Sequence, residues 1–241
     1  MKTEVSQLLE NYHCDREACF SQILSEENPW SVFLELFQAL KEETREKYRR
    51  LGISDTIFND TMSDIDIWRE NCRRQKGIDG LAEYQWLYLH MELKIFRLGR
   101  LQFQPIPYGD EVALNVHIPQ GEPLSYEAVW DSYRQAYVFF HGMTDLFVCT
   151  SWLLSPALGE ILPESSNIIR FQKDYHITAL EPDSRQCEKR VFGKLSDNFE
   201  SYPEKSSLQR GVRQYLLQGG KVGEAEGIFR LCEHCRLKEE K

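Results

Sequence analysis

The spacing of apolar side chains changes near residue 93 of this 241-residue chain, and that change constrains the fold more than any single motif. Up to about residue 92 the apolar residues recur at helical intervals, and nothing alternates with a period of two. From Lys94 onward, short apolar runs are separated by proline and glycine, which is typical of strands and turns. We therefore predict an α+β fold, with a helical N-terminal region over residues 1–92 packed on a mixed β-sheet with flanking helices over residues 93–241.

The N-terminal region is expected to hold five helices. Ser54 or Asp55 can cap the fourth of them, which should end before Gly77. The last is rich in aromatic residues and apolar nearly all round, so we expect it in the middle of the region. The predicted helical ranges are Glu4–Tyr12, Asp15–Ser25, Trp30–Leu51, the segment from Ser54 to Gly77, and Gly80–Leu93.

Strand-like segments alternate with helices in the C-terminal region. Ser125 is a helix cap, and the helix that follows lies between two apolar runs, so the pattern predicts a parallel strand pair with a right-handed crossover. Pro105, Pro107 and Gly109 should punctuate a connection between the first two strands. Predicted strands are Ile95–Phe103, Val112–Ile118, Leu146–Leu153, Ile177–Leu180 and Val222–Leu231. Predicted helices are Ser125–Phe140, Pro156–Leu162, Asn167–Asp174 and Ser207–Gln218.

Composition excludes several classes of protein. A net charge of -9 repels phosphate backbones, so nucleic acid is not an expected partner. The sequence has no apolar run long enough to cross a membrane and no secretory signal, so neither a membrane nor export is expected. Seven scattered cysteines fit a reducing compartment, which predicts a cytoplasmic protein. The oligomeric state stays open.

Polar side chains gather where two predicted strands end. Asn115 and His117 share one face of the strand over 112–118, and His117 lies near its carboxyl end. Ser151 and Trp152 end the next strand, where Cys149 shares a face with Ser151. Parallel neighbours would open all of these onto the crevice where α/β sheets bind ligands. The alternatives are a buried structural Cys149 and His117, or a thiol or serine hydrolase at Cys149 or Ser151.

Arg97 and Arg100 flank Gly99 in a segment that is otherwise apolar enough to be buried. A buried guanidinium must be paired or must hold an anion, because an unpaired buried charge costs several kcal/mol. The sequence leaves two interpretations open. One is an ion pair with Asp64, Asp66 or Glu92, and the other is a ligand carboxylate or phosphate.

Two further patterns carry weaker signals. The glycines of Gly219–Gly223 could let backbone amides approach a phosphate, although Gly219 is also explained as a helix terminus. Cys232, His234 and Cys235 are too few for a structural zinc site, which takes four ligands, so no metal is expected.

Six strings in the same order resemble a family of bacterial acyltransferases with a GNAT-like C-terminal domain, over roughly residues 54–230. They are Ser-Asp-Ile-Asp-Ile-Trp at 63–68, Phe-Arg-Leu-Gly-Arg-Leu-Gln-Phe at 96–103, Leu-Asn-Val-His-Ile-Pro at 114–119, Cys-Thr-Ser-Trp-Leu-Leu at 149–154, Asn-Ile-Ile-Arg-Phe at 167–171 and Gly-Gly-Lys-Val-Gly at 219–223.

The resemblance implies a GNAT-like sheet in which the strands ending at His117 and Trp152 splay apart to admit the pantetheine arm of acyl-CoA or acetyl-CoA. It implies direct acyl transfer to an amine, with a base for the amine and an acid for the leaving thiolate. Where the family carries a glycine-rich diphosphate turn, this sequence reads Gln120-Gly121-Glu122-Pro123-Leu124-Ser125. Only one glycine remains there, and Pro123 has no amide hydrogen. The helix N-terminus at Ser125 still supplies free amides for an anion.

The resulting hypothesis is an N-acyltransferase with an acyl-CoA co-substrate and a small-molecule amine as acceptor. The alternative is a non-catalytic binding module that has lost the diphosphate turn. His117 is the expected base and Tyr175 the expected acid. Ser125, Gly121 and Ser151 are expected at the CoA site, and Trp152, Asn115, Arg97 and Arg100 at the acceptor site.

Overall fold

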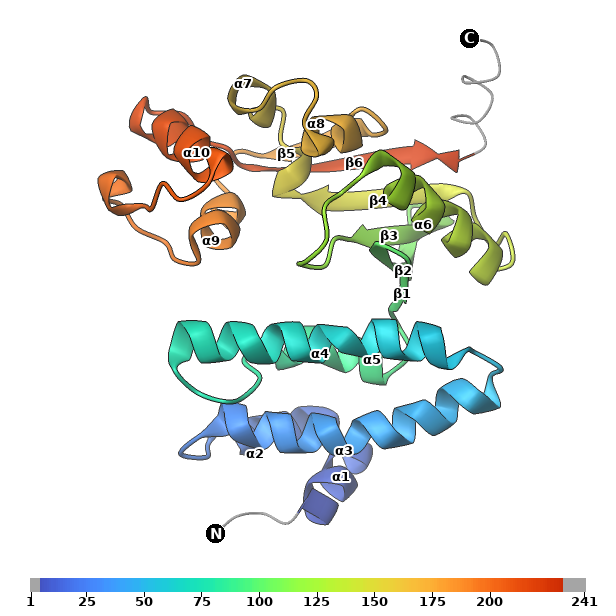
Figure 1. Ribbon diagram of the computed structural model, residues 1–241. Coiled ribbons are helices and arrows are strands. Elements are labelled where there is room, and N and C mark those ends of the chain that lie inside the picture. Colours follow the sequence, from blue (N-terminus) through green and yellow to red (C-terminus); the bar gives the residue numbers. More distant parts are fainter. Residues whose placement is uncertain (1–4, 232–241) are drawn as a thin grey trace. The chain divides into compact units, whose positions relative to one another are not determined.

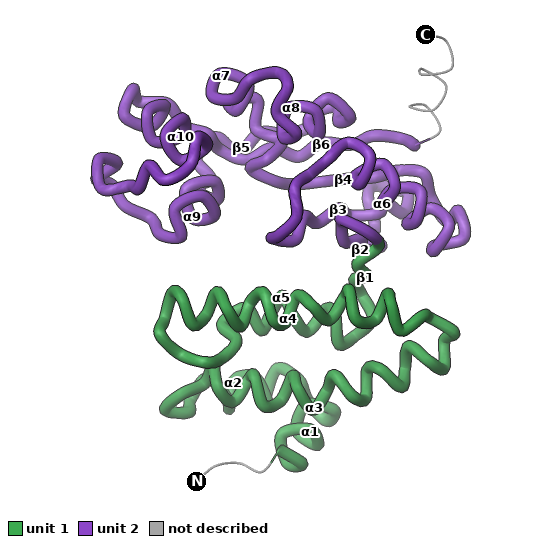
Figure 2. Tube along the Cα trace, in the orientation of Figure 1, with its two compact units in different colours: residues 1–98 green, residues 99–241 purple. Residues whose placement is uncertain are grey.

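The computed structural model describes residues 5–231 and divides the chain into two compact units, residues 1–98 and 99–241 (Figure 2). The first unit is helical until its last few residues, and the second holds most of a sheet and the remaining helices (Figure 1). The α+β class predicted from the spacing is confirmed. Among the described helices, none combines the length and the apolar character needed to cross a bilayer.

The described part of the first unit, residues 5–98, contains five helices. The predicted segments are helical where the structure describes them, except that the helix expected from Gly80 begins only at Tyr84. Ser54 caps the fourth helix by accepting a hydrogen bond from the Ile57 amide over 3.3 Å. That helix ends at Gly77, which has a φ of 70° and so adopts the left-handed conformation that glycine tolerates. The helices are α1 Val5–Cys14, α2 Arg16–Leu24, α3 Pro29–Arg50, α4 Asp55–Lys76 and α5 Tyr84–Met91.

Among residues 5–231, six strands form one mixed sheet in the order β1-β2-β3-β4-β6-β5. The parallel pair predicted around a crossover helix is confirmed as β3 and β4, with α6 between them in sequence, and the other registered neighbours are antiparallel. The strands are β1 Phe96–Leu98, β2 Leu101–Tyr108, β3 Glu111–His117, β4 Leu146–Ser151, β5 His176–Glu181 and β6 Glu224–Arg230. Helix α6 spans Tyr126–Phe139.

Two predictions about the start of the sheet were wrong. The expected strand over 95–103 is broken at Gly99, whose φ of 70° turns the chain between β1 and β2. Pro105 and Pro107 do not interrupt a strand, because both lie within β2 and pair with Leu114 and Val112. Because Pro105 and Pro107 are two residues apart, the backbone positions at which they lack an N–H donor face the same edge of β2. Strand β1 is only three residues long, so much of that side is an edge where proline is tolerated.

The two faces of the sheet differ. The face covered by α6, called here the helix-covered face, carries Phe147 and Phe229, whose rings lie 5.1 and 4.7 Å from the ring of Tyr133 on α6. The opposite face is defined by Ala113, which packs with Val148 and neighbouring side chains. Successive residues of a strand point to alternate faces, so Asn115 and His117 share the opposite face with Ala113.

Beyond β4 the chain forms short elements that pack around a second, smaller core. The expected helices near 156–162, 167–174 and 207–218 are present, and α9 was not predicted. These elements are η1 Trp152–Leu154, α7 Leu158–Ile161, α8 Asn167–Gln172, α9 Gln186–Phe192, η2 Phe199–Ser201 and α10 Ser207–Leu217. Their shared core is Leu158, Ile169, Cys187, Tyr202, Val212, Leu216 and Val222, with Trp152 against it. Figure 1 shows α9 and α10 beyond the end of the sheet toward which β4 points.

Candidate functional site

The parallel pair β3 and β4 is in register at only two positions, Leu114 with Phe147 and Asn115 with Val148. Both strands continue past this point. Strand β3 stays paired with β2 as far as His117, and β4 stays paired with β6 as far as Ser151. The two strands therefore separate toward their carboxyl ends while each keeps its outer partner. We call this stretch without ladder pairing, between residues 116–117 of β3 and 149–151 of β4, the strand slot.

His117 lies beside the strand slot, at the carboxyl end of β3 and on the opposite face of the sheet. Its Nε2 lies 3.2 Å from Oε1 of Gln104, which pairs with Asn115 across β2 and β3. Asn115 and His117 are both half-buried. The imidazole thus has a neighbour that holds its orientation.

Tyr175 lies on the helix-covered face, where its hydroxyl is 2.9 Å from the hydroxyl of Tyr133 and its ring packs against Phe229. Burial raises the pKa of both phenols well above the usual value of 10. A phenol with such a pKa keeps its proton at neutral pH. It is also a weaker acid than an ordinary tyrosine, so it gives up that proton only to a strong base.

Asp174 precedes Tyr175 and accepts a 3.0 Å hydrogen bond from the indole Nε1 of Trp130. Burial raises the pKa of this carboxyl to about 6, against the lowering effect of that hydrogen bond. Trp130 and Tyr133 are three residues apart on α6, so they point the same way. One helix face therefore contacts both Asp174 and Tyr175.

Two predicted site residues have structural roles at the tip of β4. The Ser151 hydroxyl accepts a 3.1 Å hydrogen bond from the Leu153 amide and thereby caps η1. Trp152 begins η1 and packs against the smaller core. Cys149 is fully buried, and burial raises the pKa of its thiol far above the usual value, which disfavours the thiolate a cysteine nucleophile needs.

The loop before α6 stands where the diphosphate turn was expected, and Arg100 holds it from beneath. The guanidinium donates from Nε to the Glu122 carbonyl over 2.6 Å and from an Nη to the Pro119 carbonyl over 2.9 Å. Gly121 is exposed within this loop, and Ser125 caps α6 by accepting from the Ala128 amide over 3.4 Å. Arg100 thus bonds main-chain carbonyls, a role that the sequence analysis did not consider.

The turn at Gly99 fixes where Arg100 lies. A Cβ atom at Gly99 would come within 2.8 Å of the Ser132 hydroxyl on α6, so only glycine allows this approach. The same hydroxyl accepts a 2.8 Å hydrogen bond from the Arg100 amide.

Arg97 belongs to the first unit, in contrast to the other predicted site residues. Its amide donates to the Thr61 hydroxyl over 2.9 Å, and its guanidinium donates to the Ser63 hydroxyl over 3.1 Å. Asp64, one of the expected partners of these arginines, accepts from the Trp86 indole over 2.6 Å and lies 3.3 Å from His90 Nε2.

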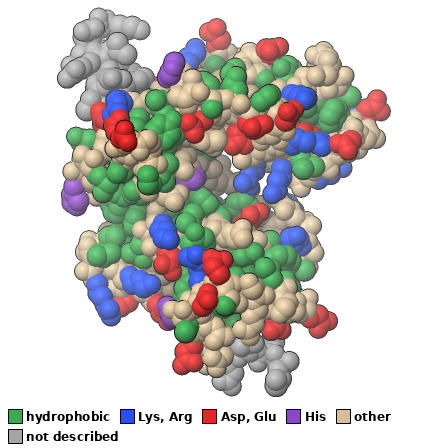
Figure 3. Space-filling model, turned by 180° about the vertical axis from the view of Figure 1, so that it is seen from behind, with side chains coloured by type: hydrophobic (Ala, Val, Ile, Leu, Met, Phe, Trp, Pro, Cys, Tyr) green, Lys and Arg blue, Asp and Glu red, His purple; other side chains and the backbone are tan. Residues whose placement is uncertain are grey.

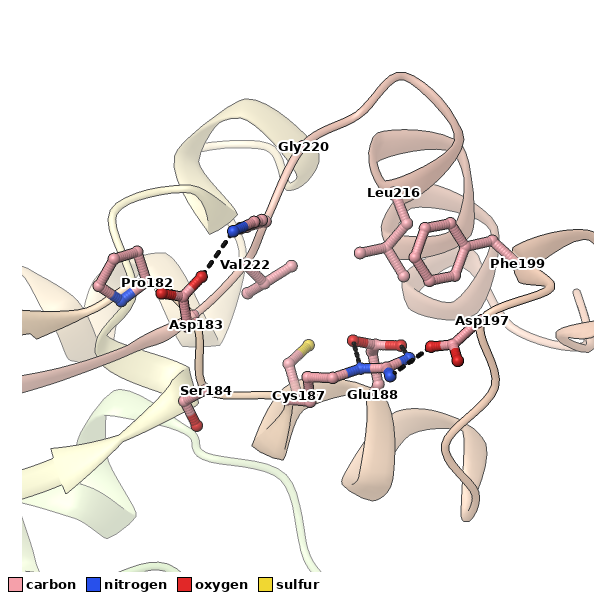
Figure 4. Close-up of a pocket in the computed structure, with 13 residues that line it drawn as sticks. Pro182, Asp183, Ser184, Cys187, Glu188, Asp197, Phe199, Leu216, Gly220 and Val222 are labelled. Atoms are coloured by element: carbon pink, nitrogen blue, oxygen red, sulfur yellow. Dashed lines mark hydrogen bonds and ion pairs between the residues drawn. The ribbon is translucent and has the colours of Figure 1, made fainter.

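A pocket of about 260 Å³ lies where β5 leads into α9 and α10 leads into β6 (Figure 4). Its lining includes Gly220–Gly223, so most of the glycine-rich stretch singled out in the sequence lies at a cavity. Arg185 bonds Glu188 and Asp197 on one side of it, and Lys221 bonds Asp183 on the other. The Arg185 pairing keeps the pKa of Glu188 below its usual range although burial opposes this.

Sequence reasoning missed Tyr133, Asp174 and this pocket. The spacing of Trp130 and Tyr133 on an amphipathic helix was the one available signal. The cluster at Cys232, His234 and Cys235 lies outside the described residues. Within residues 5–231, no group of three or more His, Cys, Asp or Glu side chains is arranged to hold a metal ion.

Two family models match the chain. The GNAT-like C-terminal domain matches residues 95–229, and the N-acyltransferase N-terminal domain matches residues 3–93. No curated protein matches the chain.

Three solved structures give the fold comparison. An acyltransferase mutant with octanoyl-CoA is 27% identical, with a TM-score of 0.79 over 85% of this chain and 67% of its own. An acyltransferase with CoA and 10C-teicoplanin is 26% identical, with a TM-score of 0.79 over 85% and 67%. An acyltransferase with decanoyl-CoA is 26% identical, with a TM-score of 0.78 over 86% and 67%.

Proposed function

Because this chain belongs to the family of N-acyltransferases with a GNAT-like C-terminal domain, we propose that it transfers an acyl group from an acyl-CoA thioester to the amine of a small molecule. The observation that carries the proposal is the strand slot, where β3 and β4 part after Asn115 and Val148. Backbone groups freed from the ladder there can bond the amides of a pantetheine arm. Similar structures with octanoyl-CoA and decanoyl-CoA bound support a medium-chain donor.

In the proposed reaction the amine nitrogen attacks the thioester carbon, a C–N bond forms and the C–S bond breaks. His117 takes the proton from the attacking amine, and Tyr175 gives a proton to the departing sulfur. The two side chains lie on opposite faces of the sheet, so the thioester would have to lie between them, in the strand slot. The buried Tyr175 keeps its proton at neutral pH, as a general acid must, although its raised pKa makes it a weaker acid than an ordinary tyrosine.

The entrance to the slot fits CoA in part. The first turn of α6 offers amide donors and a partial positive charge, which favours a diphosphate. Glu122 and Glu127 beside it oppose the same anion, and Pro123 contributes no donor. We expect the pantetheine arm to contribute more of the affinity than the diphosphate does.

The test is calorimetric titration of the full chain with butanoyl-, octanoyl- and decanoyl-CoA, followed by thiol release in the presence of a panel of primary amines. We expect saturable binding and amine-dependent release of CoA. Absence of binding for every donor would remove the proposal. Binding without CoA release for any amine would instead favour the non-catalytic binding module, which the altered diphosphate turn suggests.

A further inference from the structure

A carboxylate lies at the level of His117 on the same face of the sheet. Asn115 of β3 is in register with Val148 of β4. Two residues further toward the carboxyl ends, His117 and Thr150 therefore occupy equivalent positions and point to the opposite face. Thr150 pairs with Glu226 of β6, so Glu226 faces the same way. His117 and Glu226 belong to one row of side chains that crosses the strand slot.

Two hydroxyl groups hold the Glu226 carboxylate in place. Its Oε1 accepts hydrogen bonds from the Tyr108 hydroxyl over 2.8 Å and from the Thr178 hydroxyl over 2.9 Å. The bond to the carboxylate also raises the pKa of the Tyr108 phenol, so this side chain stays a donor. Tyr108 ends β2 and Thr178 lies in β5, so two distant segments fix the carboxylate. A group held in this way loses little conformational freedom when it binds a ligand.

No cation of the described chain neutralises Glu226. Among residues 5–231, its carboxylate takes part in no ion pair, and its second oxygen, Oε2, has no hydrogen-bond partner. Arg230, further along β6, is already bonded to Glu111 and Asp145. Glu226 is half-buried, which reduces the screening of its charge by water. It therefore offers a fixed negative charge to a cationic ligand.

This carboxylate can be reached from solvent. Thr150 and Thr178, its neighbours on β4 and β5, are both exposed. Figure 3, a view from behind, shows acidic side chains at the surface of the second unit. A molecule that approaches His117 from this face can therefore also meet Glu226.

The separation of His117 and Glu226 sets the size of such a molecule. Strands lie about 4.8 Å apart, so β3 and β6, which are two strands apart, carry these residues roughly 10 Å from each other. The parting of β3 and β4 can only lengthen this distance. An extended alkyl chain advances about 1.3 Å per bond, so two nitrogens joined by seven carbons are about 10 Å apart.

We propose that Glu226 binds a second, protonated amine of the acceptor while His117 takes the proton from the first. The inference rests on the proposed function, because it needs the reacting amine to lie beside His117. The acceptor is then a small molecule with two amines about 10 Å or more apart, such as a long diamine or an oligoamine. The second amine keeps its proton and donates a charge-assisted hydrogen bond to Oε2 of Glu226.

Two glutamates of the same face provide a matched pair of variants. Glu226→Gln and Glu181→Gln each remove one negative charge, but Glu181 is exposed at the end of β5 and pairs with Glu224, further from His117. Glutamine is close in size to glutamate and keeps an oxygen that can accept from Tyr108. We therefore expect both variants to fold.

Release of CoA from octanoyl-CoA is measured with heptylamine and with 1,7-diaminoheptane, which has the same carbon chain. In the wild-type chain and in Glu181→Gln, the KM for the diamine should be about tenfold below the KM for heptylamine, which corresponds to about 1.4 kcal/mol. Glu226→Gln should lose this difference through a rise in the KM for the diamine.

Equal KM values for the two amines in the wild-type chain overturn the inference, and so does a folded Glu226→Gln chain that keeps the tenfold difference. If Glu226→Gln does not fold, Thr178→Val removes one of the two hydroxyls that fix the carboxylate and should lose part of the difference. Full retention in that variant also overturns the inference.

Failure of every amine to release CoA would overturn the proposed function, and a binding measurement then tests Glu226 separately. Calorimetry should show that 1,7-diaminoheptane binds the wild-type chain about tenfold more tightly than Glu226→Gln. Equal affinities of the two chains for the diamine would count against Glu226 whatever reaction the protein performs.

Discussion

The guanidinium of Arg100 and the main-chain carbonyl of Glu122 are joined by a 2.6 Å hydrogen bond beneath the loop that leads into α6. A second bond, to Pro119, ties the other end of that loop. The arginine that the sequence marked as a candidate ligand group therefore shapes the entrance to the slot by holding protein carbonyls. Because the peptide bonds are trans, the Gln120 N–H points away from the guanidinium that holds the Pro119 carbonyl, whereas the Glu122 carbonyl is joined to Pro123, which has no N–H.

Replacing Arg100 with methionine should loosen this loop. Each lost hydrogen bond from the charged group should cost about 1.5–3 kcal/mol of stability. We also expect weaker binding of octanoyl-CoA but little change for octanoyl-pantetheine, which lacks the diphosphate end. Thermal unfolding and calorimetry check the two effects, with the exposed Arg134→Met as control. An equal loss for both ligands would refute the role of the loop in diphosphate binding.

His117→Ala should lower the turnover number by about 10²–10⁴, the range of a lost general base. Binding of octanoyl-CoA should change little, because the imidazole acts on the amine. The exposed His176→Ala, at the start of β5, is the control. Equal turnover of the two variants would exclude His117 as the base.

Tyr175→Phe should reduce turnover by about 10² through loss of the proposed acid, with acyl-CoA affinity preserved. The raised pKa of the phenol means that turnover should show no decline from Tyr175 ionisation between pH 7 and about 10. The pH–rate profile of the wild-type chain, beside that of the exposed Tyr137→Phe, checks this. A turnover for Tyr175→Phe equal to that of the control would assign the residue to packing alone.

The buried Asp174 should make stability depend on pH. Its pKa is raised from 3.8 to about 6, so the folded state holds a proton that the unfolded state releases between these values. The contribution of Asp174 to the free energy of unfolding is present in full below about pH 4 and is lost as the pH rises to about 6. Asp174→Asn keeps an acceptor for the Trp130 indole but has no group that titrates, so this loss of stability with rising pH should disappear.

Urea unfolding between pH 4 and pH 8 measures the difference. The free energy of unfolding of Asp174→Asn should rise by about 2–3 kcal/mol relative to that of the wild-type chain as the pH rises across this range. This follows from 1.36 kcal/mol per unit of pKa difference. Parallel stability curves for the two chains would show that Asp174 titrates normally.

Helices and their ends could be predicted with most success. Ser54, Ser125 and Gly77 act locally, through the orphan backbone groups of one helix end, so their effect is visible in a short stretch of sequence. The alternation around Asn115 likewise placed His117 on the correct relative face. The break at Gly99 and the prolines within β2 were missed because both depend on what lies beside the strand.

The candidate site was harder to predict from the sequence, because its contacts join distant parts of the chain. Tyr133 and Tyr175 are 42 residues apart, and Arg100 meets Glu122 across 22. Nothing in the local pattern of either segment indicates its partner. The pocket arises in the same way, from two loops that meet only because β5 and β6 are neighbours in the sheet.

Apolar spacing, caps and turns by themselves determined a helical half followed by a mixed sheet with one parallel crossover, since each is set by interactions between near neighbours. Only the tertiary structure decided where β3 and β4 part, which carbonyls Arg100 holds and which phenols meet beneath α6. These features depend on packing between segments far apart in sequence, whose free energy belongs to the assembled core and to no single segment.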